Sequence, residues 1–198
     1  MPECVESISG SINPDCKGLK KVGGVGRSVY VGSINDIDDI TYDATDGFIT
    51  AITLKQDKEL VKITGKLDKH NANEPIQEEG EGNVKLFEHT VNIVAYHESQ
   101  EQRNIIEDIV QLDQAFVIVP TRAKQFIVYG VAKKDEPFRE FGLSATEGED
   151  PTGETLNDMS AQTITLTGNM LHKSVLFGEG ETYENNLAAI EALTTPQV

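Results

Sequence analysis

The sequence predicts a mainly β fold of the α+β class, an antiparallel β-sandwich or barrel-like sheet with one flanking α-helix. Three observations lead to this prediction. Most of the chain alternates apolar and polar residues, which is the period of a half-buried strand. A single segment in the middle changes to the period of a helix. Strand and helix patterns do not alternate along the chain, so a doubly wound parallel fold is not expected.

The alternating segments predict about eight strands, bounded by turn-forming residues. In DGFITAITL, which follows the Asp46-Gly47 turn, Ile49 and Ala51 are expected on one face, and Phe48, Ile52 and Leu54 on the other. The strands are expected within residues 27–33, 48–54, 59–67, 83–96, 114–119, 124–132, 136–145 and 160–175.

Two of these strands carry the clearest patterns. In NVKLFEHTVNIVAY, His89 shares one face with Phe87, Val91 and Ile93. QAFVIV and KQFIVYGVA are separated by a short turn and predict a hairpin.

The one segment with a strong helical period is Ser99–Leu112. Ser99 followed by Gln102 fits a capping box, which satisfies amide groups at a helix N-terminus. The helix is expected to lie against a sheet along one face, which carries Gln102, Ile105, Ile106, Ile109 and Leu112.

The remaining segments suggest how the domain is organised. Residues 1–26 are expected to be a flexible arm, and residues 27–180 a single β-sandwich domain. Within it, residues 70–83 and 146–158 are rich in Glu and Gly and predict two long acidic loops. The Asp-rich stretch at 34–47 predicts turns with a short helical turn. The tail at 181–198 predicts a weak helix over Leu187, Ala188, Ile190 and Leu193.

Composition excludes several classes of function. The formal net charge is −16 in 198 residues, which argues against a protein that grips nucleic acid or an anionic membrane through a basic face. The N-terminus lacks the pattern of a signal peptide, and no apolar run approaches the roughly 20 residues of a membrane helix. Cys4 and Cys16 are too few for a disulfide scaffold. These features predict synthesis in a reducing cytoplasm.

No motif predicts catalysis, a cofactor or a metal, so the chain is not expected to be an enzyme. GGVGRS precedes a strand and lacks the lysine of a phosphate loop. None of the four histidines lies in a metal-binding motif. The Asp-rich stretch fits either a loose calcium site or, more simply, a solvated turn; its aspartates are Asp36, Asp38, Asp39, Asp43 and Asp46.

The order of short segments along residues 14–170 resembles a known group of proteins. PDCKG and GGVGRSVYVGSINDI lead into DGFITAITL, NVKLFEHTVNIVAY and the helix at 99–112. The QAFVIV and QFIVYG hairpin, FGLSA, a loop with PTG and TITLTG follow. This order resembles tail tube and tail-ring virion proteins of tailed phages of Bacteroidetes, crAss-like phages included. The chain departs from that pattern at PTRAKQF, where a turn of the Asp-x-Asn-Gly type is expected.

The resemblance implies a structural subunit that assembles with copies of itself into rings. Such rings stack into a channel, through which genomic DNA passes without specific binding. The implied partners are neighbouring tail or connector proteins, the implied location is the virion tail, and the host cytoplasm is the place of assembly. The inner wall of such a ring is a continuous β-barrel with strands from every copy.

A channel strand should have a threonine face toward water and an apolar face toward the core. TITLTG is the first candidate, with Thr163, Thr165 and Thr167, and DGFITAITL is the second, with Thr50 and Thr53. Three alternatives remain open: a head-to-tail connector of the same particle, a monomeric β-sandwich module that binds a sugar or calcium, and an enzyme with a carboxylate pair.

Overall fold

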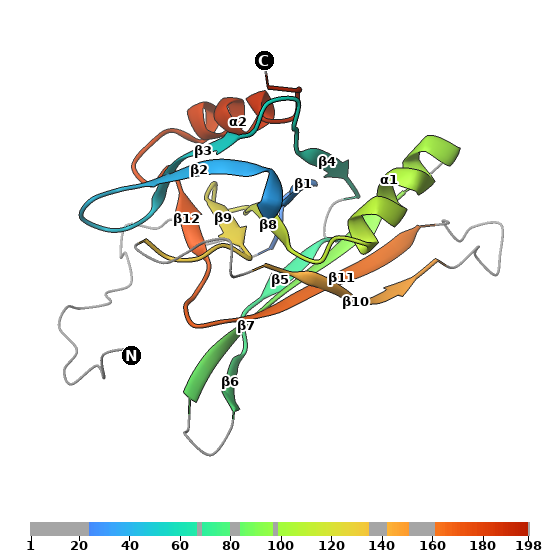
Figure 1. The fold of residues 1–198 in the computed structure, drawn as a ribbon, viewed down its shortest axis with the longest axis horizontal. Helices are drawn as coiled ribbons and strands as arrows, with labels where there is room; N and C mark the ends of the chain where they lie inside the picture. The colour runs from blue at the N-terminus through green and yellow to red at the C-terminus, as the bar shows by residue number, and fades with distance from the viewer. Residues whose placement is uncertain are drawn as a thin grey trace.

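The strands of the computed structural model form two sheets, and the structure describes residues 24–66, 69–79, 84–96, 99–134, 142–150 and 161–197 (Figure 1). The larger sheet has seven strands. Their order is β2 (Ile37–Tyr42), β3 (Ile49–Leu54), β12 (Val175–Phe177), β9 (Phe126–Tyr129), β8 (Ala115–Pro120), β1 (Ser28–Ser33) and β4 (Val61–Thr64). Its pairs are antiparallel except β12 with β3, which run parallel.

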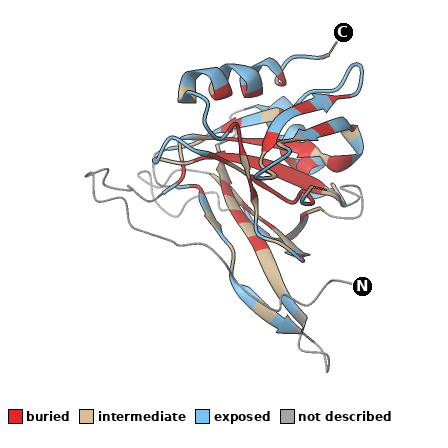
Figure 2. Ribbon diagram, turned by 90° about the vertical axis from the view of Figure 1, so that its left-hand side faces the viewer, coloured by how far each residue is buried: buried red, intermediate tan, exposed pale blue. Residues whose placement is uncertain are grey.

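The smaller sheet has five strands and is antiparallel throughout. Its order is β10 (Ser144–Glu149), β11 (Gln162–Met170), β7 (Val84–Ala95) and β5 (Asn71–Asn73), while β6 (Ile76–Glu79) pairs with the first part of β7. The hairpin of β6 and β7 projects from the body, where most buried residues are concentrated (Figures 1 and 2).

The apolar residues form two cores, one on each face of the seven-stranded sheet. Strand β8 has all six residues buried because it contributes to both cores. Val117 packs in the first core, between the two sheets, and Phe116 packs in the second. The mainly β fold of the α+β class is confirmed.

Helix α1 (Gln100–Val110) covers one side of the core between the sheets and buries Ile106 and Ile109. The predicted capping box is present. The Ser99 hydroxyl accepts from the Gln102 amide at 3.3 Å, and the Gln102 side chain accepts from the Ser99 amide at 3.2 Å.

Replacing Ser99 with alanine should lower the free energy of unfolding by about 1 kcal/mol, because the Gln102 amide in the first turn of the helix loses its acceptor. Urea denaturation measures this loss. Ser99→Asp keeps an acceptor at this position and should stay near the wild-type value. Equal losses in the two variants would contradict the capping role.

A second helix, α2 (Tyr183–Ala192), confirms the weak helix expected in the tail. Ile190 and Leu193 pack in the second core. Buried Asn186 donates to the Gly178 carbonyl at 2.9 Å, which fastens the helix to the turn after β12. The flanking helix at 99–112 is therefore one of two in the described residues.

The structure corrects the prediction of two long acidic loops. Residues 70–83 contain β5 and β6, and His70 at their start is only 4% exposed. Residues 146–149 belong to β10. The sequence does not predict these strands, because they lie at sheet edges and contain too few apolar residues to form an alternating pattern. With β2 in the Asp-rich stretch, the described strands number twelve rather than eight. That stretch also begins with the expected helical turn, a 3-10 turn at Ile34–Asp36.

The predicted faces of β3 are wrong at Ile49. Ile49, Ile52 and Leu54 are all buried, although Ile49 was expected opposite the other two. The register of β2 with β3 shifts between Thr41 and Tyr42, so one extra residue of β3 interrupts the alternation. By contrast, three of the four residues expected to share one face of β7 are fully buried, His89, Val91 and Ile93, and Phe87 is half-buried.

Several predictions concern residues outside the described ones: Cys4, Cys16, His97, most of the arm at 1–26, the start of the 136–145 strand and residues 151–158. Of the arm, only 24–26 are described. Val25 is 7% exposed and forms a β-bridge with Thr121, so the folded body begins before residue 27.

Candidate functional site

The outer face of the five-stranded sheet is a polar depression of about 620 Å³. Three adjacent strands build it, and their outward positions carry hydroxyl, amide and carboxylate groups. It is lined by Glu88, Thr90 and Asn92 of β7, Ser144, Thr146 and Glu147 of β10, and Thr165, Thr167, Gly168 and Asn169 of β11. The opposite face of β11 carries Ile164 and Leu166, both fully buried. The sheet therefore separates a wet face from the core.

Hydrogen bonds between side chains connect these strands across the depression. Thr165 Oγ1 donates to Asn92 Oδ1 at 2.8 Å, and Thr167 Oγ1 lies 3.2 Å from Thr146 Oγ1. Glu88 accepts from Gln77 of β6 at 2.7 Å. Cross-strand pairs of this kind stabilise a sheet without apolar contact. The polar face is thus ordered before any partner is bound.

The charge of this face has one sign. Its lining includes two carboxylates, Glu88 and Glu147, and neither a lysine nor an arginine. No aromatic residue lines it either, which disfavours stacking against sugar rings or bases. The arrangement suits a water-filled surface that does not retain polyanions.

The structure separates the two sets of predicted channel threonines. Thr165 and Thr167 line the depression, and Thr163 lies on the same face of β11. Thr50 and Thr53 are exposed on β3, which belongs to the seven-stranded sheet. The five residues do not form one surface, and TITLTG is the strand that lies in the polar face.

Of the residues that line this face, the sequence analysis named only Thr165 and Thr167 as candidates. The alternation along β7 predicts that the residues between the buried ones point outward, and these are Glu88, Thr90 and Asn92. The positions of Thr146 and Ser144 could not be predicted, because Ala145 is the only residue of β10 that is even half-buried and the strand shows no apolar alternation. The register of β10 shifts between Ala145 and Glu147, which places Thr146 at a bulge.

Both edges of the five-stranded sheet are open among the described residues. On one side, β10 pairs only with β11; on the other, β5 and β6 pair only with β7. Open edges present unpaired amide and carbonyl groups, which are a template for another strand.

Two buried histidines connect the sheets. His70 Nδ1 accepts from the Val94 amide of β7 at 3.2 Å, and its Nε2 donates to the Arg27 carbonyl before β1 at 3.1 Å. His89 Nδ1 accepts from the Gly130 amide after β9 at 3.3 Å. One ring nitrogen accepts in each case, so both rings are neutral.

His89 is fully buried, and its Nε2 donates to the His172 carbonyl at 2.9 Å. A Glu74 oxygen lies 3.7 Å from the same nitrogen. Burial lowers the pKa of His89, and the Glu74 carboxylate opposes part of that shift. Burial also lowers the pKa of His70. Both rings are engaged by backbone groups and therefore serve the fold.

Acidification should destabilise the protein through these two rings. In the unfolded chain they take up protons near the ordinary pKa of 6.5, and in the folded chain only at lower pH. The unfolded state then binds more protons, so stability is fully present above about pH 7 and falls as the pH drops below 6.5. Urea denaturation between about pH 7.5 and 5.5, above the range of ordinary carboxylates, measures this. A flat profile would contradict it.

In the described residues, no three or more His, Cys, Asp or Glu side chains come close enough together to hold a metal ion. The aspartates at 36–46 therefore do not form a group that could bind a metal ion. Among those same residues, none of the helices is both long and apolar enough to cross a membrane.

Comparison of the chain with protein-family models, curated proteins and solved structures gave no match.

Proposed function

We propose that this chain is a non-enzymatic structural subunit of a phage tail, and that its copies form rings that stack into a channel for DNA. The observation that carries the proposal is the polar face of the five-stranded sheet, which contains carboxylates but no cation and lies between two open strand edges. The order of segments that resembles tail tube and tail-ring proteins supports it independently.

Ring closure follows from the two edges. In a ring, β10 of one copy pairs with the β5 and β6 edge of the next, so the small sheets join into one barrel. Each copy already covers the apolar side of its sheet with its own core. The polar side is left for the channel, and edge pairing removes the exposed edges.

The chemistry of the wall suits passage of DNA. A duplex bound through lysine or arginine would be held by many phosphate contacts. Threonine and asparagine side chains keep water at the wall, and Glu88 and Glu147 repel phosphate. The net charge of −16 on the whole chain also repels the phosphates of DNA.

A second candidate function is a monomeric ligand-binding module, favoured by the volume of the depression, about 620 Å³. A connector at the head-to-tail junction would use the same surfaces as a tail ring and differs in its position in the particle.

Negative-stain electron microscopy of the purified protein at high concentration tests the proposal, with sedimentation over a concentration series. The proposal expects rings or stacked tubes with a central hole. Monomers at every concentration, with a melting temperature that rises on addition of a sugar or calcium, would instead support the binding module.

A further inference from the structure

The two end strands of the seven-stranded sheet, β2 and β4, differ in how their edges are protected. β2 carries the exposed carboxylates of Asp38 and Asp39, and charge on an edge strand opposes pairing with another segment. The exposed residues of β4 are Lys62 and Thr64, and the Lys62 ammonium group forms an ion pair with Glu191 of α2. The β4 edge is therefore the less protected of the two.

The hydrogen bonds of β4 show which of its backbone groups are open. The Gly65 amide, directly after β4, donates at 2.7 Å to the carbonyl of Arg27, which lies opposite it in the register of β1 and β4. The direction of backbone groups alternates along an antiparallel pair. Ile63 therefore also faces β1, whereas Lys62 and Thr64 direct their amide and carbonyl groups away from it. Within the described residues, β4 has no strand partner on that side.

The end of the chain already occupies the next stretch of this edge. The Leu60 amide, just before β4, donates to the Leu193 carbonyl at 2.8 Å. The Asp57 amide donates to the Gln197 carbonyl at 2.9 Å. This side of the sheet thus binds a segment of the same chain as far as Leu60, and the open part is β4 itself.

The open part borders an apolar notch of about 280 Å³. The notch lies between β4 and α1, which Figure 1 shows on the same side of the molecule. Its apolar lining includes Val61, Ile63 and Ile106, and Ile105, which also lines it, is 37% exposed. A strand added here would find backbone partners along β4 and an apolar surface beside them.

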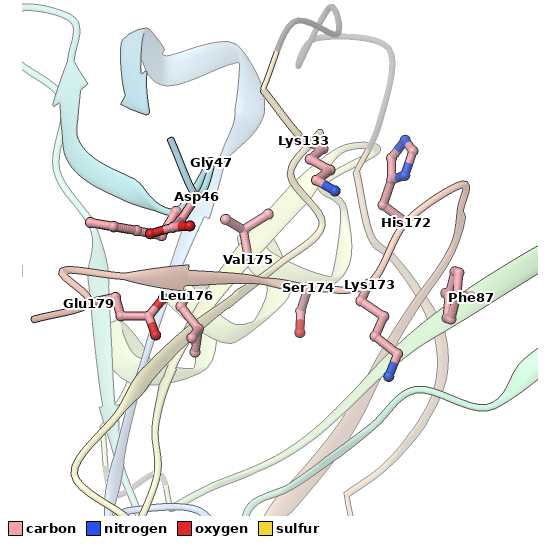
Figure 3. A pocket seen from close by; sticks show the side chains of 11 residues that line it. Asp46, Gly47, Phe87, Lys133, His172, Lys173, Ser174, Val175, Leu176 and Glu179 are labelled. Atoms are coloured by element: carbon pink, nitrogen blue, oxygen red, sulfur yellow. The ribbon is translucent and has the colours of Figure 1, made fainter. Parts of the chain in front are cut away.

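A larger cleft beside β12 does not combine these features. Its volume is about 380 Å³, and Figure 3 shows Asp46 and Glu179 on one side of it and Lys133 and Lys173 on the other. Its charges are thus balanced within one copy, and β12 is paired on both sides. The notch beside β4 is therefore better suited to bind an extended segment.

The N-terminal arm contains a segment with the matching pattern. In SISGSI, residues 7–12, serines alternate with Ile8, Gly10 and Ile12. Both isoleucines would lie on one face of an extended strand, about 13 Å apart, which is close to the length of a four-residue strand such as β4.

The arm is also long enough to reach the notch of its own chain. The described chain begins at Gly24, three residues before Arg27, which faces Gly65 at the end of β4. Residues 13–23 lie between the segment and Gly24 and span up to roughly 36 Å when extended. A tether of this kind gives the segment a high effective concentration at its own β4, which favours binding within one chain.

We propose that residues 7–12 add to the free side of β4 of the same chain as an extra strand, with Ile8 and Ile12 against the notch. The serines of the segment lie on its other face. The arm thereby closes the edge of the large sheet that carries no carboxylates. This pairing occurs within one chain and does not require ring assembly.

Hydrogen exchange of single amides, followed by NMR on the dilute full-length protein, tests the pairing. The amides of Lys62 and Thr64 should exchange about 100-fold more slowly than unprotected amides, because each donates to the added strand. Ile8→Asn with Ile12→Asn should remove most of this protection, since the segment loses its apolar contact. The amide of Ile63 faces β1, so it should stay slow in every variant and shows that the sheet is intact.

Ser9→Asn with Ser11→Asn is the matched control, because it places the same side chains on the opposite face of the segment. In this variant the exchange of the Lys62 and Thr64 amides should stay within about threefold of the wild-type rates.

Three results would overturn the pairing. The first is a wild-type chain whose Lys62 and Thr64 amides exchange as fast as unprotected ones. The second is an equal loss of protection in the two asparagine variants, which would exclude a contact through the isoleucine face. The third is protection that rises with protein concentration, which would place the arm of another copy on β4. Each of these results leaves the tail function standing, because ring formation is tested separately by electron microscopy.

Discussion

Rings in which Thr165 and Thr167 are replaced by lysine should retain duplex DNA that wild-type rings release. Both side chains line the polar face, so every copy adds two cations to the proposed channel wall. If about four phosphates are neutralised, binding should weaken roughly 100-fold between about 50 and 200 mM salt, because each contact contributes to counterion release. The measurement is co-sedimentation of a linear duplex added before assembly.

A second pair of threonines, on the other sheet, provides the control for this experiment. Thr50→Lys with Thr53→Lys makes the same change in net charge on exposed positions of the other sheet. These rings should release DNA as the wild type does. Equal retention by both lysine variants would mean that the polar face of the small sheet is not the channel wall.

Replacement of His89 by leucine should lower the free energy of unfolding by about 2–6 kcal/mol. The ring is fully buried, accepts from the Gly130 amide and donates to the His172 carbonyl. Leucine leaves both backbone groups without a partner, and each such group costs about 1–3 kcal/mol. Urea denaturation at pH 7.5 gives the loss directly.

His89→Gln is the informative comparison, because its amide retains a donor near the position of Nε2. It should lose clearly less stability than His89→Leu. The leucine variant should also show a weaker fall of stability below pH 6.5, since His70 is then the one of the two buried rings that still contributes a lowered pKa. A leucine variant as stable as the wild type would contradict the role of His89 in joining the sheets.

Local patterns predicted the elements whose environment is uniform along their length. Strand β11 has a fully buried face at Ile164 and Leu166 and a wet threonine face, so its alternation is regular. Helix α1 carries both its capping box and its buried stripe within a short segment. The hairpin of β8 and β9 was predictable because continuous apolar runs mark strands that are covered on both sides.

Edge strands and bulges were not predictable in this way. β5 and β6 contain Asn, Gln and Glu, and they are strands because β7 supplies partners for their backbone groups. The burial of Ile49 beside Ile52 depends on the shifted register with β2. The candidate site shows the same division: the polar residues of β7 and β11 follow from alternation, but Thr146 reaches the depression through the bulge of β10.

The sequence alone determined the mainly β class, the acidic character, helix α1 and the strand TITLTG with its two faces, because each depends on residues close together in the chain. Only the tertiary structure decided that Thr165 faces Asn92 and that Thr50 belongs to the other sheet. These relations join residues far apart in sequence, and they exist only once backbone pairing and burial have selected one register.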